Sequence, residues 1–285
     1  MIKSFAVLAV LMAGCSIIGG PGSPPANVTL QRWADFMANK PADTIVFARD
    51  LTQGGGWSGP NADNAKIAFL AGAIQATVEL PDQEPPSGDV VWSDGTSQQM
   101  ALTSAKVAFG AMVAELMAAG GSCNGCRALR VTGAELTMRD ATTSHGAASV
   151  PVWQFAFAPG DEPIDPISYV ALRDRIGPRD WPSWGDHAPF TEAAYATPVD
   201  AQVTIAFTGG ACDASHSIVA VESAVAIVPV ISTAARPGAC TAQGILYGLQ
   251  VQLASPLGNR VVLDPDSGFP IPVYPEDPPA ALQPG

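Results

Sequence analysis

One stretch decides the fold: Val150-Pro151-Val152-Trp153-Gln154-Phe155-Ala156-Phe157. Its side chains alternate between two sets, with an aromatic residue at every second position from Trp153. A period of two residues is typical of a β-strand, because successive side chains point to opposite faces. An earlier strand begins at residues 129–132, and Thr143-Ser144-His145-Gly146 supplies a turn between the two. The sequence therefore predicts a β-hairpin in the first half.

A second hairpin and a helix are predicted upstream of this one. Residues 90–95 predict a strand that enters a hairpin, because Asp94-Gly95 suits a type I′ turn, and residues 98–102 return. Thr103 or Ser104 then caps a helix predicted over 105–118. The apolar stripe of this helix is formed by Ala105, Phe109, Met112, Val113 and Leu116.

The second half is rich in short apolar runs separated by turn residues. These runs are residues 203–207, 217–221, 225–231, 246–253 and 260–263. Their spacing predicts a small antiparallel sheet or sandwich. A short helix is also expected over 28–40, with Leu30, Trp33 and Phe36 at helical spacing. The expected class is therefore α+β, with two β-rich parts, of which the first carries a hairpin and a packed helix.

Composition shifts divide the chain into six predicted regions. Many prolines and tryptophans between residues 173 and 198 leave little room for regular structure, which is typical of a linker. The predicted regions are 1–14 signal peptide, 15–27 lipidated cysteine and flexible spacer, 28–172 N-terminal α+β domain, 173–198 linker, 199–274 C-terminal β domain and 275–285 disordered tail.

The first fifteen residues predict export and lipidation. Lys3 precedes an apolar run over residues 5–12, and this run is much shorter than the roughly 20 residues of a spanning helix. Ala13-Gly14 then places two small residues before Cys15. This pattern resembles the lipobox of bacterial lipoproteins, in which the thiol of the cysteine is acylated and becomes the mature N-terminus. The alternative is an ordinary secreted protein that is cut nearby, with Cys15 lost or incidental.

Composition limits the classes of partner. The net charge is −12, and 47% of the residues are hydrophobic. Such an acidic chain offers no basic surface for nucleic acid and would repel anionic lipid headgroups. The expected contact with the membrane is therefore made by the lipid on Cys15 alone. The predicted location is the outer face of the cytoplasmic membrane.

Four cysteines remain after Cys15: Cys123, Cys126, Cys212 and Cys240. An even number in an exported protein predicts two disulfides, with three pairings open. Proximity in the sequence favours Cys123–Cys126 and Cys212–Cys240. The Cys-x-x-Cys spacing also allows a redox site, but the pair follows a predicted helix instead of opening one, so a structural bridge is favoured.

No catalytic or metal-binding pattern is evident in the sequence, and neither a cofactor nor a metal is expected. The histidines at 145, 187 and 216 are widely separated. Ser217 is close to His216 and Asp213, but neighbouring side chains of a strand point to opposite faces. The carboxylates Asp161, Glu162 and Asp165 are expected in a solvated loop, and Asp264 in a tight turn.

Three tryptophans lie outside any periodic stripe: Trp57 in a glycine-rich loop, and Trp181 and Trp184 in the predicted linker. Exposed tryptophans on loops stack on sugars or anchor a protein partner, so these three are the candidate binding residues. The competing interpretation, which the sequence favours, is that they fill the join between the two halves.

A set of short motifs carries a family resemblance. In order they are Trp92-Ser93-Asp94-Gly95, Cys123-Asn124-Gly125-Cys126, Leu129-Arg130-Val131-Thr132-Gly133-Ala134, Val150-Pro151-Val152-Trp153-Gln154-Phe155, Ala220-Val221-Glu222-Ser223 and Pro256-Leu257-Gly258-Asn259-Arg260-Val261-Val262-Leu263-Asp264. Together they resemble a group of secreted lipoproteins from high-GC Gram-positive bacteria. The resemblance implies export and the disulfides, and it implies no reaction.

The expected function is that of a lipid-anchored extracytoplasmic protein, a non-catalytic binding or envelope component with an envelope protein or a glycan as partner. A cell-envelope hydrolase, whose site is assembled from residues distant in the sequence, is the alternative. A secreted redox protein is a third hypothesis.

Overall fold

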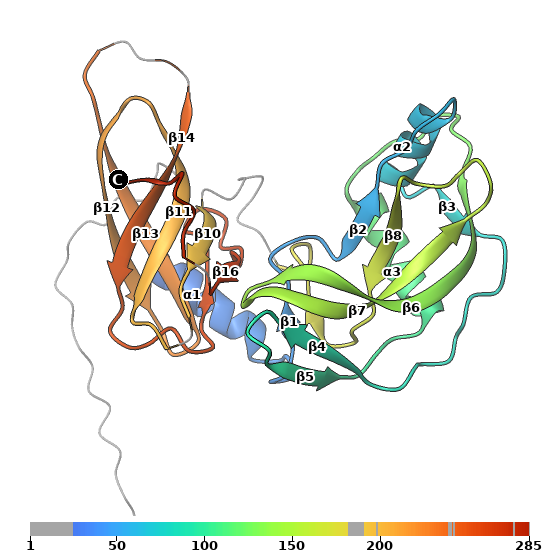
Figure 1. Cartoon of the computed structure of the whole chain (residues 1–285), viewed down its shortest axis with the longest axis horizontal. Coiled ribbons are helices and arrows are strands. Elements are labelled where there is room, and N and C mark those ends of the chain that lie inside the picture. Colours follow the sequence, from blue (N-terminus) through green and yellow to red (C-terminus); the bar gives the residue numbers. More distant parts are fainter. Residues whose placement is uncertain are drawn as a thin grey trace, which may run out of the picture.

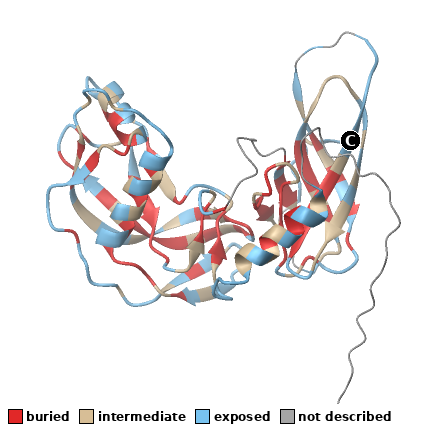
Figure 2. Ribbon diagram, turned by 180° about the vertical axis from the view of Figure 1, so that it is seen from behind, coloured by how far each residue is buried: buried red, intermediate tan, exposed pale blue. Residues whose placement is uncertain are grey.

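The computed structural model describes residues 25–181, 191–197, 199–238, 241, 243–275 and 277–284, and it has two lobes (Figure 1). The chain is α+β, as the sequence predicts, with several sheets and three helices among the described residues. The first lobe holds β2–β8 with α2 and α3, and the second lobe holds β10–β17. Buried residues concentrate in the middle of each lobe (Figure 2).

The hairpin predicted around residues 143–146 is long and lies at the centre of the first lobe. It is formed by β6 (Leu129–Thr143) and β7 (Gly146–Phe157), which pair antiparallel from the tip at 143–146. The strand β7 pairs on its other side with both β8 and β4, so it joins most of the seven-stranded sheet. The remaining elements of this lobe are β2 (Thr52–Gly55), α2 (Ala62–Leu70), β3 (Ile74–Ala76), β4 (Gly88–Trp92), β5 (Ser97–Met100), α3 (Ala105–Ala118) and β8 (Asp165–Val170).

Local signals place the β4–β5 hairpin and α3 where the sequence predicts them. Asp94 accepts hydrogen bonds from the backbone N–H and the hydroxyl of Thr96, and Gly95 has a φ of 83°. The turn is not of the predicted type I′, because that type needs a positive φ at both central residues, and among the described residues only glycines have one. Ser104 caps α3 by accepting a hydrogen bond from the N–H of Val107.

The second lobe is a sandwich of two sheets. Their strand orders are β16-β10-β11-β14-β17 and β12-β13-β15, and each sheet contains parallel as well as antiparallel pairs. Side chains from both sheets share one core, for example Ile205 of β11 and Ile227 of β13. The strands are β10 (Thr191–Tyr195), β11 (Gln202–Gly210), β12 (Asp213–Glu222), β13 (Ala226–Ala235), β14 (Gly244–Gln252), β15 (Val261–Val262), β16 (Val273–Tyr274) and β17 (Gln283–Pro284).

The first helix packs on the second lobe. The sequence predicts residues 28–172 as one domain, but α1 (Ala26–Met37) lies against β13, and Figure 2 shows it across the sandwich lobe. Leu30 and Trp33 of its apolar face are 7% and 1% exposed and belong to one cluster with Val228. Helical spacing defines which face of a helix is apolar, but it carries no information on the partner.

Two further segments differ from the predicted layout. Within the predicted linker, β9 (Arg175–Ile176) pairs in parallel with β1 (Ile45–Val46). The predicted disordered tail contains β17, which pairs with β14, and the side chain of Leu282 packs near Gly248. A short polar strand forms because the edge of a sheet offers it hydrogen-bond partners. The sequence around the strand gives no sign of that edge, so it does not predict the strand.

Candidate functional site

A cleft with a volume of about 760 Å³ lies between the lobes. Its first wall is formed by the β4–β5 hairpin and the tip of the β6–β7 hairpin, and its second wall by residues 223–225 and 255–261 of the sandwich lobe. Residues of α1 and β1 also line it. Segments that are distant in the sequence therefore face one space, whose volume falls in the range of about 300–1,000 Å³ that is typical of ligand sites.

The hydroxyl of Thr143 organises the first wall. Its Oγ1 accepts hydrogen bonds from Nε1 of Trp92 at 3.3 Å and from the backbone N–H of His145 at 3.1 Å. The same hydroxyl donates to the carbonyl oxygen of Gly146 at 2.9 Å. One buried threonine thus holds the indole of Trp92 and the hairpin tip in a single arrangement.

The second wall is held by an ion pair with little exposure to solvent. Arg260, which is 8% exposed, binds Glu222 with 2.6 Å between Nη1 and Oε2. Its remaining N–H groups donate to the carbonyl oxygens of Ser255, Pro256 and Leu257 at 2.8–3.1 Å. Because its charge is paired and its donors bind the carbonyl oxygens of residues 255–257, Arg260 stabilises the conformation of the loop at 255–260.

Two groups of the first wall have shifted pKa values. Hydrogen bonds from the hydroxyl and the backbone N–H of Thr96 lower the pKa of Asp94, so this carboxylate is ionised at neutral pH. Desolvation lowers the pKa of His145 below 6.5, although the residue is also exposed to solvent. Its imidazole is therefore neutral at neutral pH. The wall therefore offers one carboxylate and one neutral imidazole to the cleft.

The predicted binding tryptophans are not brought together in the described part of the chain. Trp57 lies beside a smaller pocket of about 440 Å³ on the first lobe and packs 5.2 Å from the ring of Phe69. Trp181 is 3% exposed and packs against Trp33 and Phe36, so it fills the join between α1 and its surroundings and is not an exposed platform. Trp184 lies outside the described residues.

Two other tryptophans line the cleft, Trp33 and Trp92. Trp33 is 1% exposed, whereas Trp92 is only partly buried, and the binding hypothesis from the sequence did not include it. Its position directly before the Asp94-Gly95 turn is the signal that could have identified it, because a large aromatic side chain at the end of a hairpin strand is often only partly covered.

Two residues of the Ser217, His216 and Asp213 set lie close in space. Nε2 of His216 lies 3.5 Å from Oδ2 of Asp213, and Nδ1 lies 3.0 Å from Oγ1 of Thr233 on the neighbouring strand. An irregularity in the β12–β13 register between residues 213 and 215 changes the alternation, so Asp213 and His216 face the same side. Ser217 belongs to the next register pair and is not their partner.

The carboxylates near residue 161 do not form a solvated cluster. Asp161 is 1% exposed and pairs with the guanidinium groups of Arg127 and Arg130, with 3.0 Å to Nε of Arg130. Glu162 and Asp165 are exposed, as expected. Asp161 lies in a loop, as predicted, but the expectation that it is solvated is wrong, because two arginines that are 31 and 34 residues away make its burial possible.

Asp264 lies in a tight turn, as the sequence predicts. It is fully buried and accepts hydrogen bonds from the backbone N–H groups of Asp266 and Ser267. A further bond from the N–H of Thr191 ties the turn to β10.

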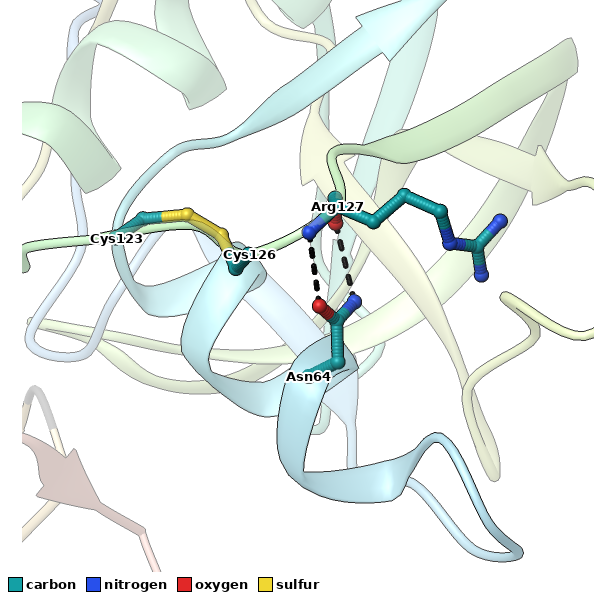
Figure 3. Close-up of a disulfide and its surroundings, with 4 residues drawn as sticks. All are labelled: Asn64, Cys123, Cys126 and Arg127. Atoms are coloured by element: carbon teal, nitrogen blue, oxygen red, sulfur yellow. Dashed lines mark hydrogen bonds between the residues drawn. A yellow bond between two sulfur atoms is a disulfide. The ribbon is translucent and has the colours of Figure 1, made fainter.

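Cys123 and Cys126 form a disulfide with 5.5 Å between their Cα atoms. Figure 3 shows that it lies beside α2, where the amide of Asn64 binds both backbone groups of Arg127 at 2.8 and 3.0 Å. Cys212 is also disulfide-bonded, but Cys240 lies outside the described residues, so their pairing stays a prediction. Cys15 and His187 lie outside the described residues as well.

The described residues contain no group of three or more histidines, cysteines or carboxylates arranged to hold a metal ion. Within the same part of the chain, no helix is long and apolar enough to span a membrane. Comparisons of this chain with protein-family models, curated proteins and solved structures found no match.

Proposed function

We propose that this chain is a lipid-anchored extracytoplasmic protein of the bacterial envelope, which acts by binding a ligand in the cleft between its lobes. The observation that carries the proposal is the cleft of about 760 Å³, to which both lobes contribute polar side chains. We place the chain with the secreted lipoproteins of high-GC Gram-positive bacteria that its motifs resemble.

Hydrogen bonds hold both walls of the cleft in place, which favours binding. The hydroxyl of Thr143 positions Trp92, and the Arg260–Glu222 ion pair fixes residues 255–260. A ligand that enters such a site loses less free energy to the ordering of side chains than one that binds flexible loops. The ligand is an envelope component, since the predicted anchor keeps the protein at the envelope, and the net charge of −12 opposes binding to nucleic acid.

A pair of neighbouring serines provides the test of the cleft. Ser93 lines it, whereas Ser97 lies on the same hairpin but is not part of the lining. The purified full chain is sedimented with insoluble cell-wall material. We expect Ser93→Trp to weaken binding about tenfold and Ser97→Trp to leave it unchanged. Equal binding by both variants, or no binding by the unmodified protein, would overturn the proposal.

The anchor is tested separately by intact mass. After expression in a bacterium that processes lipoproteins, we expect a chain that begins at Cys15 and carries the added mass of acyl chains. Two or more chains are needed for stable attachment, because a single chain gives only marginal membrane binding. Cys15→Ser is expected to abolish both cleavage and membrane retention. A soluble chain that still begins at Met1 would contradict the anchor.

The arrangement around His216 favours hydrolysis of an envelope substrate as the second candidate function. Nε2 of His216 lies 3.5 Å from Oδ2 of Asp213, and its Nδ1 lies 3.0 Å from the hydroxyl of Thr233, within reach for accepting the proton as this oxygen attacks a carbonyl carbon. A fluorophosphonate probe tests this function, since attack by Thr233 would form an O–P bond and release fluoride. Labelling that Thr233→Ala abolishes and Ser232→Ala retains would support it, and absence of labelling would reject it.

A further inference from the structure

We propose that the cleft between the lobes binds a neutral saccharide, with one sugar ring stacked on Trp92 and its hydroxyl groups bound by polar side chains of both walls. This inference rests on the proposed function, since it names the ligand class of the same cleft. It is carried by the charge of the lining, by its mixture of hydrogen-bond donors and acceptors, and by the fixed position of one aromatic ring.

The charge of the lining disfavours an anionic ligand. Among the described residues that line the cleft, Arg260 is the only lysine or arginine, and its guanidinium is paired with Glu222 and with loop carbonyl oxygens. Asp43 and Asp94 add two carboxylates. A phosphate or carboxylate group in this cleft would therefore meet negative charge without an unpaired cation to compensate for it.

Neutral polar side chains outnumber charged ones on the lining, and this favours hydroxyl groups over a cation. They are Thr44, Ser93, Thr96, Gln98, Ser223, Ser255 and Asn259, and His145 joins them in its neutral form. Serine and threonine hydroxyls and amides both donate and accept hydrogen bonds, as sugar hydroxyls do. The carboxylates accept from hydroxyls that lie next to each other on a ring, and the hydrogen bond from Gln98 Nε2 to the carbonyl of Asp43 orients that amide at 3.0 Å.

Trp92 supplies an apolar surface among these polar groups. The ring is only partly covered, and the bond from its Nε1 to Thr143 uses its one polar donor. What remains for a ligand is an aromatic surface that suits the apolar C–H side of a sugar ring. Because Thr143 already fixes the indole, little conformational entropy is lost when a ring packs on it.

The walls derive from different lobes, which determines the size of the ligand. Trp92 and Gln98 belong to the first lobe, whereas Ser255 and Asn259 belong to the second. A ligand that contacts all of them spans the cleft, so a short oligosaccharide binds more tightly than a monosaccharide of the same type.

Calorimetry with the purified full chain tests the inference, with chitotriose, maltotriose and mannotriose as neutral probes and spermidine and a lysine-rich peptide as cationic ones. We expect at least one trisaccharide to bind, with an affinity that changes less than about twofold between roughly 50 and 500 mM NaCl. Trp92→Ala is expected to weaken this binding about tenfold or more, and Trp92→Phe only about threefold, because phenylalanine retains an aromatic face.

Val91→Ala is the matched control, since Val91 is an exposed neighbour on β4 that does not line the cleft. Saccharide binding that Trp92→Ala leaves intact would overturn the inference. Binding of a cationic probe alone, sensitive to salt and to Ser93→Trp, would overturn the saccharide but retain a ligand site in the cleft. If no probe binds and Ser93→Trp also has no effect on cell-wall binding, both the inference and the proposed function fail.

Discussion

Gly146→Ala is the most direct test of how the two lobes meet. Gly146 lies at the tip of the β6–β7 hairpin with a φ of 99°, a value that residues with a side chain rarely adopt. A Cβ atom at this position would lie 2.5 Å from the carbonyl oxygen of Val273 on β16 and 3.5 Å from Cδ of Pro275. The substitution therefore introduces a clash between the lobes in addition to local strain.

Gly95→Ala separates these two effects. Gly95 also lies in a hairpin turn of the first lobe, its φ is 83°, and a Cβ atom at this position would meet no other atom within 4 Å. Both substitutions carry a backbone strain of about 1–2 kcal/mol. The approach of 2.5 Å at Gly146 requires a shift of about 1 Å by either the tip or β16, and overpacking of this kind costs about 1–3 kcal/mol more.

Urea unfolding and small-angle X-ray scattering measure the outcome. We expect Gly146→Ala to unfold at lower urea than Gly95→Ala, or to keep its stability while its radius of gyration increases because the lobes move apart. Ligand binding in the cleft would weaken in either case. If the two variants match in stability and in scattering, the contact between the hairpin tip and β16 does not hold the lobes together, and the reasoning is wrong.

Three further predictions concern single groups. Replacement of Cys123 and Cys126 by serine removes a link that closes a four-residue loop and is expected to cost about 2 kcal/mol in urea unfolding, and no measurable cost would contradict it. Burial raises the pKa of Glu115 above 4.5, although Tyr169 donates a hydrogen bond to it. Folding therefore favours the protonated form of Glu115. Its contribution to stability is fully present below about pH 4.3 and is lost as pH rises through the raised pKa. Glu115→Gln should therefore gain stability relative to the unmodified protein between pH 4 and 8, whereas a constant difference would refute the shift. Desolvation lowers the pKa of His145, so its NMR titration is expected to have a midpoint below 6.5, and a midpoint above this value would exclude the desolvation.

Elements that depend on residues close together in the chain were predictable from the sequence. The hairpin of β6 and β7, the Asp94-Gly95 turn and the Ser104 cap depend on alternation, turn chemistry and a side chain three residues from its partner. The disulfide between Cys123 and Cys126 belongs to the same group, because only two residues lie between the two cysteines.

The candidate site was largely beyond such signals. The lining of the cleft combines residues 42–46, 92–98 and 255–261. These segments are too far apart in the sequence for a local pattern to link any two of them. The proximity of Asp213 to His216 depends on a strand irregularity that ordinary alternation does not anticipate. Burial of Asp161 depends on arginines from another part of the lobe.

By itself, the sequence determined the α+β class, the main hairpins, the helix over 105–118 and the close cysteine pair, because each is encoded by interactions between residues near one another in the chain. Only the tertiary structure decided that α1 covers the sandwich lobe, that residues 283–284 extend the edge of β14, and that Trp92 instead of Trp181 faces a cleft. The physical reason is that an apolar face, an open strand edge and an aromatic ring each accept many partners, and the packing of the whole chain selects one.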